Sequence, residues 1–400
     1  MSNLPSSDRE ISANRASRQQ IVTVWIVALV LTVLSLTSHL MAGSTLHQDK
    51  EMWQYKVSVH QRVHAFQVRP LTTSIVVALH DHAGVPFRTG FMVLQFMLFL
   101  LCGPVFWYFL RILGFSPAYS LAGMIIYLLT LPLFLAHFEP VHTWSDFWVY
   151  LFVPLSFTMA MRRRYVVALI TIGLALMARE TTFLFLPVWF LFIYADRDRR
   201  YTLAAGLTLL AAALFVGARL WFFGRITAPP EADFQFNFEN YLRGSDTIFS
   251  LIVSLGFVWV VGLWKVFHRA RLPIRFYNLI RFGAIFTAAG FVSSTILMAR
   301  ARETRLFVPP VIFLLPLILV YVQERAARIK SILRRLPAWT TALGGVALLA
   351  LGIWAAKLAF PRFEYRLWPD GNWAYLGLHL ALIALFLIVE LSRLGAPVAD

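Results

Sequence analysis

Long apolar runs, separated by short polar connections rich in arginine, make up most of this sequence. A helix needs about 20 mostly apolar residues to cross the hydrocarbon core of a bilayer. The candidate runs lie at about 21–41, 91–110, 117–136, 147–161, 165–178, 182–195, 201–223, 247–264, 282–299, 306–323, 338–358 and 374–392. The pattern predicts an all-α, polytopic transmembrane helical bundle of about 12 spans, within a range of about 11–13 because residues 70–80 could form a further short helix on the outer surface.

The spans predict a single transmembrane domain over 21–393, which includes a long outer loop at 42–90. Basic residues are densest in alternate connections, above all at 162–164 and 325–335. Loops rich in Lys and Arg stay in the cytoplasm. We therefore expect residues 1–20 and 394–400 to be cytoplasmic tails, and the first apolar run to be retained as a span because more spans follow it.

Composition supports a lipid environment rather than a soluble fold. Hydrophobic residues make up 59% of the chain and charged residues 14%, whereas soluble proteins carry about 25% charged residues. The net charge of +16 follows from the loop arginines, so we predict no nucleic-acid partner. A single cysteine, Cys102, forms no internal disulfide. We also predict no cofactor, because the sequence contains no nucleotide-binding loop. A metal ion at His80-Asp81-His82 is the weaker alternative, since these residues do not have a recognised metal-ligand spacing.

Three of the predicted spans, at 147–161, 165–178 and 182–195, are too short to cross a bilayer alone. At about 1.5 Å per residue each reaches only about 21–23 Å, against a core of about 30 Å. Short or broken helices occur at membrane depth where protein or water surrounds them, so we expect a site there. A tilted hairpin with an outer Arg–Glu pair is the alternative. The sequence Ala-Arg-Glu-Thr between the last two spans, at 178–181, recurs at 301–304.

Charged side chains beside apolar spans are costly and often have a role, and arginine binds phosphate through two hydrogen bonds. An acid at a helix N-terminus or an arginine paired with its neighbouring glutamate would explain the same residues structurally. The candidates for phosphate or substrate binding are Arg69, Arg179, Glu180, Arg302, Glu303 and Arg305, and the secondary candidates are Glu139, His142 and Asp146.

Several segments together resemble the GT-C superfamily of polytopic glycosyltransferases, over about residues 20 to 325. They are the early loop sequence His-Gln-Asp-Lys-Glu-Met-Trp-Gln-Tyr at 47–55, Arg-Pro-Leu at 69–71, Ala-Arg-Glu-Thr at 178–181, and Glu-Thr-Arg ahead of a proline-containing span at 303–309. The early loop lacks the paired acidic motif of some members of the superfamily.

The resemblance implies a bacterial enzyme of the cytoplasmic (inner) membrane. Such an enzyme transfers a sugar from a polyprenyl-phosphate donor to an envelope glycan, lipid or protein acceptor on the extracytoplasmic face. Asp49 would be the general base, with Glu51 as the alternative, and Arg179, Arg302 and Arg305 would hold the donor phosphate. Two other readings stay open: a transporter or flippase for a lipid-linked or anionic solute, and a non-catalytic subunit of envelope polysaccharide assembly.

Overall fold

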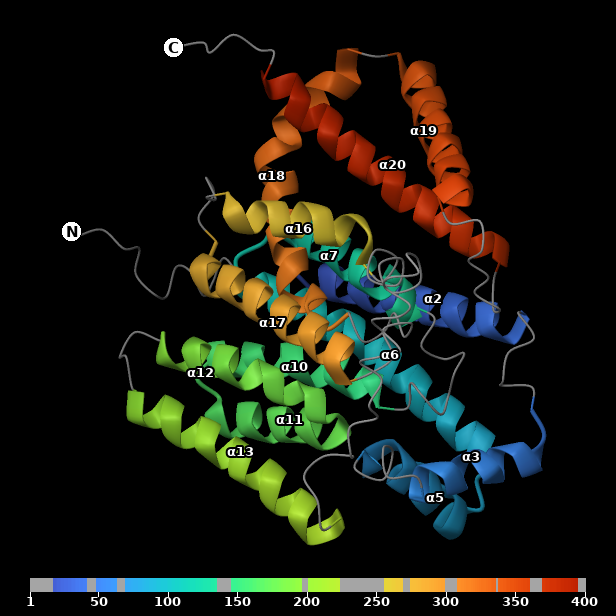
Figure 1. The fold of residues 1–400 in the computed structure, drawn as a ribbon, viewed down its shortest axis with the longest axis vertical. Coiled ribbons are helices and arrows are strands. Elements are labelled where there is room, and N and C mark those ends of the chain that lie inside the picture. Colours follow the sequence, from blue (N-terminus) through green and yellow to red (C-terminus); the bar gives the residue numbers. More distant parts are fainter. Residues whose placement is uncertain are drawn as a thin grey trace. The chain divides into compact units, whose positions relative to one another are not determined.

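The regular structure of the described residues is entirely helical (Figure 1). The computed structural model describes residues 17–41, 48–62, 69–134, 145–195, 201–223, 255–268, 274–298, 308–335, 337–359 and 369–394. Its elements are α2 (Arg18–Met41), α3 (Lys50–Arg62), α5 (Pro70–Ala83), α6 (Phe87–Ile112), α7 (Pro117–Leu129), α8 (Leu131–Phe134), α10 (Asp146–Met161), α11 (Tyr165–Ala178), η2 (Glu180–Phe185), α12 (Leu186–Tyr194), α13 (Tyr201–Phe223), α16 (Phe257–Phe267), α17 (Tyr277–Met298), α18 (Val311–Arg335), α19 (Ala338–Ala359) and α20 (Pro369–Leu394). The all-α prediction is confirmed for this part of the chain.

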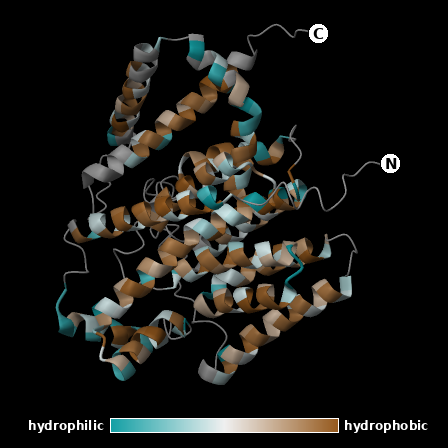
Figure 2. Cartoon of the chain, turned by 180° about the vertical axis from the view of Figure 1, so that it is seen from behind, coloured by the Kyte–Doolittle hydropathy of each residue, from teal (hydrophilic) through white to brown (hydrophobic). Residues whose placement is uncertain are grey.

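Three helices are long and apolar enough to cross a membrane, judged by length and composition within the described residues: Arg18–Leu40, Phe87–Ile112 and Tyr201–Trp221. Figure 2 shows that hydrophobic residues dominate most of the helices. These helices support the predicted lipid bilayer partner. Each of the other predicted segments also overlaps a helix. The count of about 12 spans stays a prediction.

The chain divides into two compact units. Unit 1 contains Met1–Pro230 and Ile274–Leu279, and unit 2 contains Glu231–Pro273 and Ile280–Asp400. The predicted single transmembrane domain over 21–393 is not tested by this division, and each unit is described by itself.

In unit 1, α6 packs against α2, α7 and α10 along its length and against α3 and α5 near its start. A glycine lets these helices approach closely. A Cβ atom at Gly103 would lie 3.0 Å from Cδ1 of Leu128 and 3.2 Å from Cβ of Ala28. The ring of Phe106 stacks on Tyr127, with 4.0 Å between the ring centroids. The centre of unit 1 is therefore tightly packed helix against helix.

The described residues of the predicted outer loop at 42–90 include α3 and α5, ahead of the start of α6 at Phe87. The further short helix considered for residues 70–80 is present as α5, which begins at Pro70, a residue that suits the first turn because it has no N–H to satisfy. α5 ends at Gly84, whose φ of 65° is in the left-handed region. α3 buries Trp53 and Val57 against α5 and α6. α5 also packs against α11, and so brings its first residues to the site described below.

The predicted span at 182–195 is a broken helix. α11 ends at Ala178, and Arg179 is extended, with φ −154° and ψ 125°. The 3-10 helix η2 follows over Glu180–Phe185, and α12 then starts next to Pro187. The expected short helices are confirmed, since α10 has 16 residues and α11 has 14. The break leaves two charged residues in the middle of an apolar chain segment.

In unit 2, α16 packs against α18 and α20, and α19 packs against α20. Two ion pairs join these helices: Nζ of Lys265 lies 2.5 Å from Oε2 of Glu324, and Nε of Arg325 lies 2.9 Å from Oε1 of Glu390. Glu324 and Arg325 are neighbours on α18, so they fix the rotation of that helix against α16 and α20. A Cβ atom at Gly262 would lie 2.9 Å from a methyl group of Leu314, which shows how closely α16 approaches α18.

Candidate functional site

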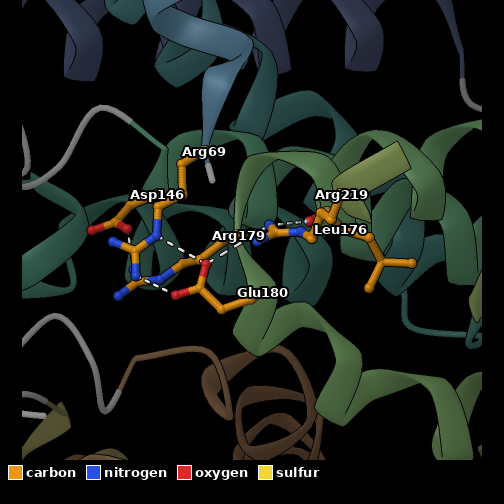
Figure 3. A network of polar contacts seen from close by, with 6 residues as sticks. All are labelled: Arg69, Asp146, Leu176, Arg179, Glu180 and Arg219. Atoms are coloured by element: carbon orange, nitrogen blue, oxygen red, sulfur yellow. Dashed lines mark hydrogen bonds and ion pairs between the residues drawn. The ribbon is translucent and has the colours of Figure 1, made fainter. Parts of the chain in front are cut away.

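Charged side chains from four segments of unit 1 meet in one network, three of whose side chains are buried and two half-buried (Figure 3). The residue before α5, the first residue of α10, the break between α11 and η2, and the last turns of α13 supply them. α11 packs against α5, α10 and α13, and so holds the segments together. The network consists of Arg69, Asp146, Arg179, Glu180 and Arg219, with the backbone carbonyl of Leu176.

Glu180 lies between two arginines (Figure 3). Nε of Arg69 donates to Oε2 of Glu180 at 3.0 Å, and Nη2 of Arg69 donates to Oε1, so the two groups form a bidentate pair. On the other side, Nη2 of Arg219 lies 3.8 Å from Oε2 of Glu180. The same nitrogen donates to the carbonyl of Leu176 at 3.2 Å. That carbonyl belongs to the last turn of α11, where no helical N–H is available, so Arg219 caps the broken helix.

Arg179 pairs with Asp146 rather than with its neighbour Glu180. Nη1 of Arg179 donates to Oδ1 of Asp146. The side chain of Arg179 is 4% exposed and that of Asp146 is fully buried. Asp146 is the first residue of α10, where the helix dipole favours a negative charge. The pair therefore joins the start of α10 to the end of α11 away from water.

The electrostatic interactions within the network are strong, because most of its side chains are buried. Arg219 is fully buried near the end of a span candidate, and its guanidinium lies 4.5 Å from the ring centroid of Phe215. Glu180 lies outside the three span candidates. Burial raises the pKa of Glu180, but the charge and hydrogen bonds of Arg69, and the charge of Arg219, outweigh this and lower it to about 2. Glu180 is thus ionised, and the three arginines and two acids of the network sum to a charge of +1.

Two donors next to Glu180 in sequence are buried without a hydrogen-bond partner among the described residues. They are Nε of Arg179 and the hydroxyl of Thr181. A buried donor without an acceptor is costly and uncommon in native proteins. Each of these donors could hydrogen-bond to an added acceptor.

The structure brings together four of the residues that the sequence singled out: Arg69, Asp146, Arg179 and Glu180. Arg302, Glu303 and Arg305 lie outside the described residues, as do Glu139 and His142. Their predicted roles therefore stay predictions.

The two predicted catalytic acids lie at the start of α3. Oδ1 of Asp49 accepts from the backbone N–H of Met52 at 2.8 Å, so Asp49 is the N-cap of α3, and its side chain is exposed. Glu51 is exposed in the first turn. Within the described residues, neither side chain hydrogen-bonds to the network around Glu180. Their role as general base is not tested by this arrangement.

Sequence reasoning missed Arg219. It stands within the apolar run at 201–223. A charged residue inside an apolar run carries a functional signal, and that signal could have identified it.

No group of three or more histidine, cysteine or acidic side chains that could hold a metal ion occurs among the described residues. Comparisons of the chain with protein-family models, with curated proteins and with solved structures found no match.

Proposed function

We propose that this protein is a membrane glycosyltransferase of the GT-C type, which transfers a sugar from a polyprenyl-phosphate donor to an envelope glycan, lipid or protein acceptor on the extracytoplasmic face of a bacterial inner membrane. The observation that carries the proposal is the convergence of the guanidinium groups of Arg69, Arg179 and Arg219 in one largely buried network. Membrane proteins place such groups in apolar surroundings mainly where a polar ligand or ion has to bind.

The charge of the network suits this donor. A sugar linked to a polyprenyl phosphate is a phosphodiester with one negative charge, and the five network residues sum to +1. Arginine binds phosphate oxygens through two parallel hydrogen bonds. Nε of Arg179 and the hydroxyl of Thr181 are buried donors that phosphate oxygens could satisfy. Two apolar neighbouring helices, α11 and α12, offer surfaces for the polyprenyl chain.

The proposed reaction needs no cofactor. The acceptor hydroxyl oxygen forms a bond to the anomeric carbon of the sugar, and the bond from that carbon to the phosphate oxygen breaks. Its electron pair leaves with the polyprenyl phosphate, whose added negative charge the arginines stabilise. Asp49 takes the proton of the acceptor hydroxyl. A general base has to lie about 2.6–3.2 Å from that hydroxyl in the bound complex.

The first experiment measures binding of the carrier alone. The purified full chain is titrated with polyprenyl phosphate, and with polyprenol as the probe that lacks phosphate. We expect Arg179→Gln to weaken the binding of polyprenyl phosphate by at least about tenfold, since a charged hydrogen bond is worth about 1.5–3 kcal/mol. Arg164→Gln removes an exposed arginine and is the matched control. If the wild-type protein binds polyprenyl phosphate and polyprenol equally tightly, the proposed phosphate site is wrong.

The second experiment tests the base. Asparagine caps a helix as well as aspartate does, so Asp49→Asn removes the base while α3 keeps its N-cap. Membranes that contain this variant should bind polyprenyl phosphate normally and should lose transfer of radiolabelled sugar from polyprenyl-phosphate-linked donors. Glu51→Gln is the companion variant for the alternative base. If transfer survives in both variants, the base lies elsewhere.

One observation favours a transporter for an anionic or lipid-linked solute as a second candidate. The break between α11 and η2, with charged residues at the break, is a feature of helices that line transport sites. A transporter would carry labelled polyprenyl-phosphate-linked sugar across a vesicle membrane and would leave the sugar on its carrier. Covalent transfer to an acceptor would decide for the enzyme.

A further inference from the structure

We propose that the second half of α18 binds one anionic phospholipid of the surrounding bilayer. The acyl chain would lie on Val322, Ala326 and Ile329, and the phosphate would lie between Lys330 and Arg334. This site belongs to unit 2 and does not depend on the proposed sugar transfer.

The surface is an open groove of about 500 Å³ lined by Val322, Ala326, Ile329, Lys330 and Arg334. Their spacings of 4, 7, 8 and 12 residues from Val322 are those of a single face of an α-helix. At about 1.5 Å per residue the lined stretch is about 18 Å long. Of that length, about 10 Å from Val322 to Ile329 is apolar, so it covers the part of an acyl chain nearest its headgroup within one leaflet of a core of about 30 Å.

The lining changes from apolar to basic along the helix. Val322, Ala326 and Ile329 come first, nearest the buried first half of α18, and Lys330 and Arg334 follow with exposed side chains. A phospholipid has the same order of groups along its length, with the acyl chains at one end and the phosphate at the other. A soluble acidic partner would be matched by the basic end alone and would leave the apolar part uncovered.

The ion pairs of unit 2 determine which charges of α18 point to the groove. Residues 322–335 contain one acid, Glu324, and it pairs with Lys265 on α16. Arg325 pairs with Glu390 on α20. The acid is thus directed away from the groove, whereas Lys330 and Arg334 line it. Among the described residues, the lining of the groove therefore presents positive charge without a carboxylate.

The sequence supports an anionic rather than a neutral lipid. Residues 322–335 hold five basic residues against one acid. Basic clusters of this kind beside a membrane segment attract anionic lipids electrostatically. The clustering of arginine also predicts that this segment is on the cytoplasmic side, so the lipid would belong to the inner leaflet.

The test is native mass spectrometry of the full chain in detergent, titrated with dioleoylphosphatidylglycerol or dioleoylphosphatidylcholine. We expect the first phosphatidylglycerol to bind more tightly than phosphatidylcholine. The double variant Lys330→Gln/Arg334→Gln should weaken the binding of phosphatidylglycerol by about 30-fold, about fivefold for each charge. It should leave the binding of phosphatidylcholine unchanged. Arg18→Gln/Lys357→Gln is the matched control, because it removes one exposed arginine and one exposed lysine at the ends of other apolar helices.

A second variant tests the apolar half of the site. Ala326→Trp fills the groove without a change of charge and should weaken both lipids. The single variants Lys330→Gln and Arg334→Gln provide the measurement if the double variant fails to fold. The proposal is overturned if the variants of Lys330 and Arg334 keep the wild-type preference for phosphatidylglycerol, if soluble glycerol phosphate displaces the lipid, or if these variants change the oligomeric state while lipid binding stays the same.

Discussion

Neutralising Asp146 should destabilise unit 1 strongly. Asp146→Asn keeps the size of the side chain but removes the charge that faces Arg179, whose side chain is only 4% exposed. Removal of one partner from a buried ion pair costs about 3–5 kcal/mol, because the other charge is left in a medium of low polarity. At about 2–4 °C per kcal/mol for a unit of this size, the melting temperature should fall by about 6–20 °C.

The assay is thermal unfolding of the full chain in one detergent, followed by tryptophan fluorescence. The double variant Asp146→Leu/Arg179→Met removes both charges and replaces them with apolar side chains of similar volume. Replacement of a whole buried pair in this way is often neutral for stability. The melting temperature of the double variant should therefore be close to that of the wild-type protein. A double-mutant cycle then gives the coupling between the two residues.

The same double variant separates a structural from a functional role. If the network binds donor phosphate, the variant regains stability but not the binding of polyprenyl phosphate. If it regains both, the network is structural and the proposed phosphate site is wrong. If Asp146→Asn melts at the wild-type temperature, or if the double variant melts as low as the single one, the unpaired charge of Arg179 does not destabilise unit 1.

Two further changes test the packing and the charges of unit 1. Gly103→Leu should destabilise the protein by at least about 1–3 kcal/mol, since even a Cβ atom there would lie 3.0 Å from Leu128; Gly173→Leu, where a Cβ atom meets nothing within 4 Å, is the control in the same melting assay. The pKa of Glu180 is lowered from 4.5 to about 2 in the folded protein, so its pairing stabilises the fold above about pH 4.5 and this contribution is lost as the pH falls towards 2. The melting temperature of Glu180→Gln should therefore fall less between pH 5 and pH 3 than that of the wild-type protein, and equal slopes would contradict the assigned pairing.

Hydrophobic pattern alone located many of the helices, because an apolar run ends where charged residues begin. The segments predicted at 165–178 and 201–223 coincide with α11 and α13. α3 was not predicted, since Lys50–Arg62 is largely polar and has no extended apolar run. Its Trp53 packs on Phe91 of α6, with 5.4 Å between the ring centroids. That contact is tertiary, and local periodicity carries no information about it.

The sequence identified most residues of the network but not their pairing. Arg179 and Glu180 were expected to pair with each other in the structural alternative. Neighbouring residues point in different directions when the chain is extended, as it is at Arg179. Arg179 instead meets Asp146, and Glu180 meets Arg69, residues that lie 33 and 111 positions away in the sequence. Pairings at such separations depend on how the helices pack, which no spacing rule for short motifs predicts.

Stability alone is a weak explanation for the ion pairs Arg179–Asp146 and Arg69–Glu180. Well-packed apolar side chains often stabilise a protein as well as a buried ion pair does. The contacts within the network are also unequal. Arg69 holds Glu180 through two hydrogen bonds, whereas the charged nitrogen of Arg219 lies 3.8 Å from the same carboxylate. A phosphate bound at this network would therefore compete with Glu180 for Arg219 more readily than for Arg69, and Arg69 would keep Glu180 in place. A charged site at a helix break can in this way stay folded when empty and still receive an anion.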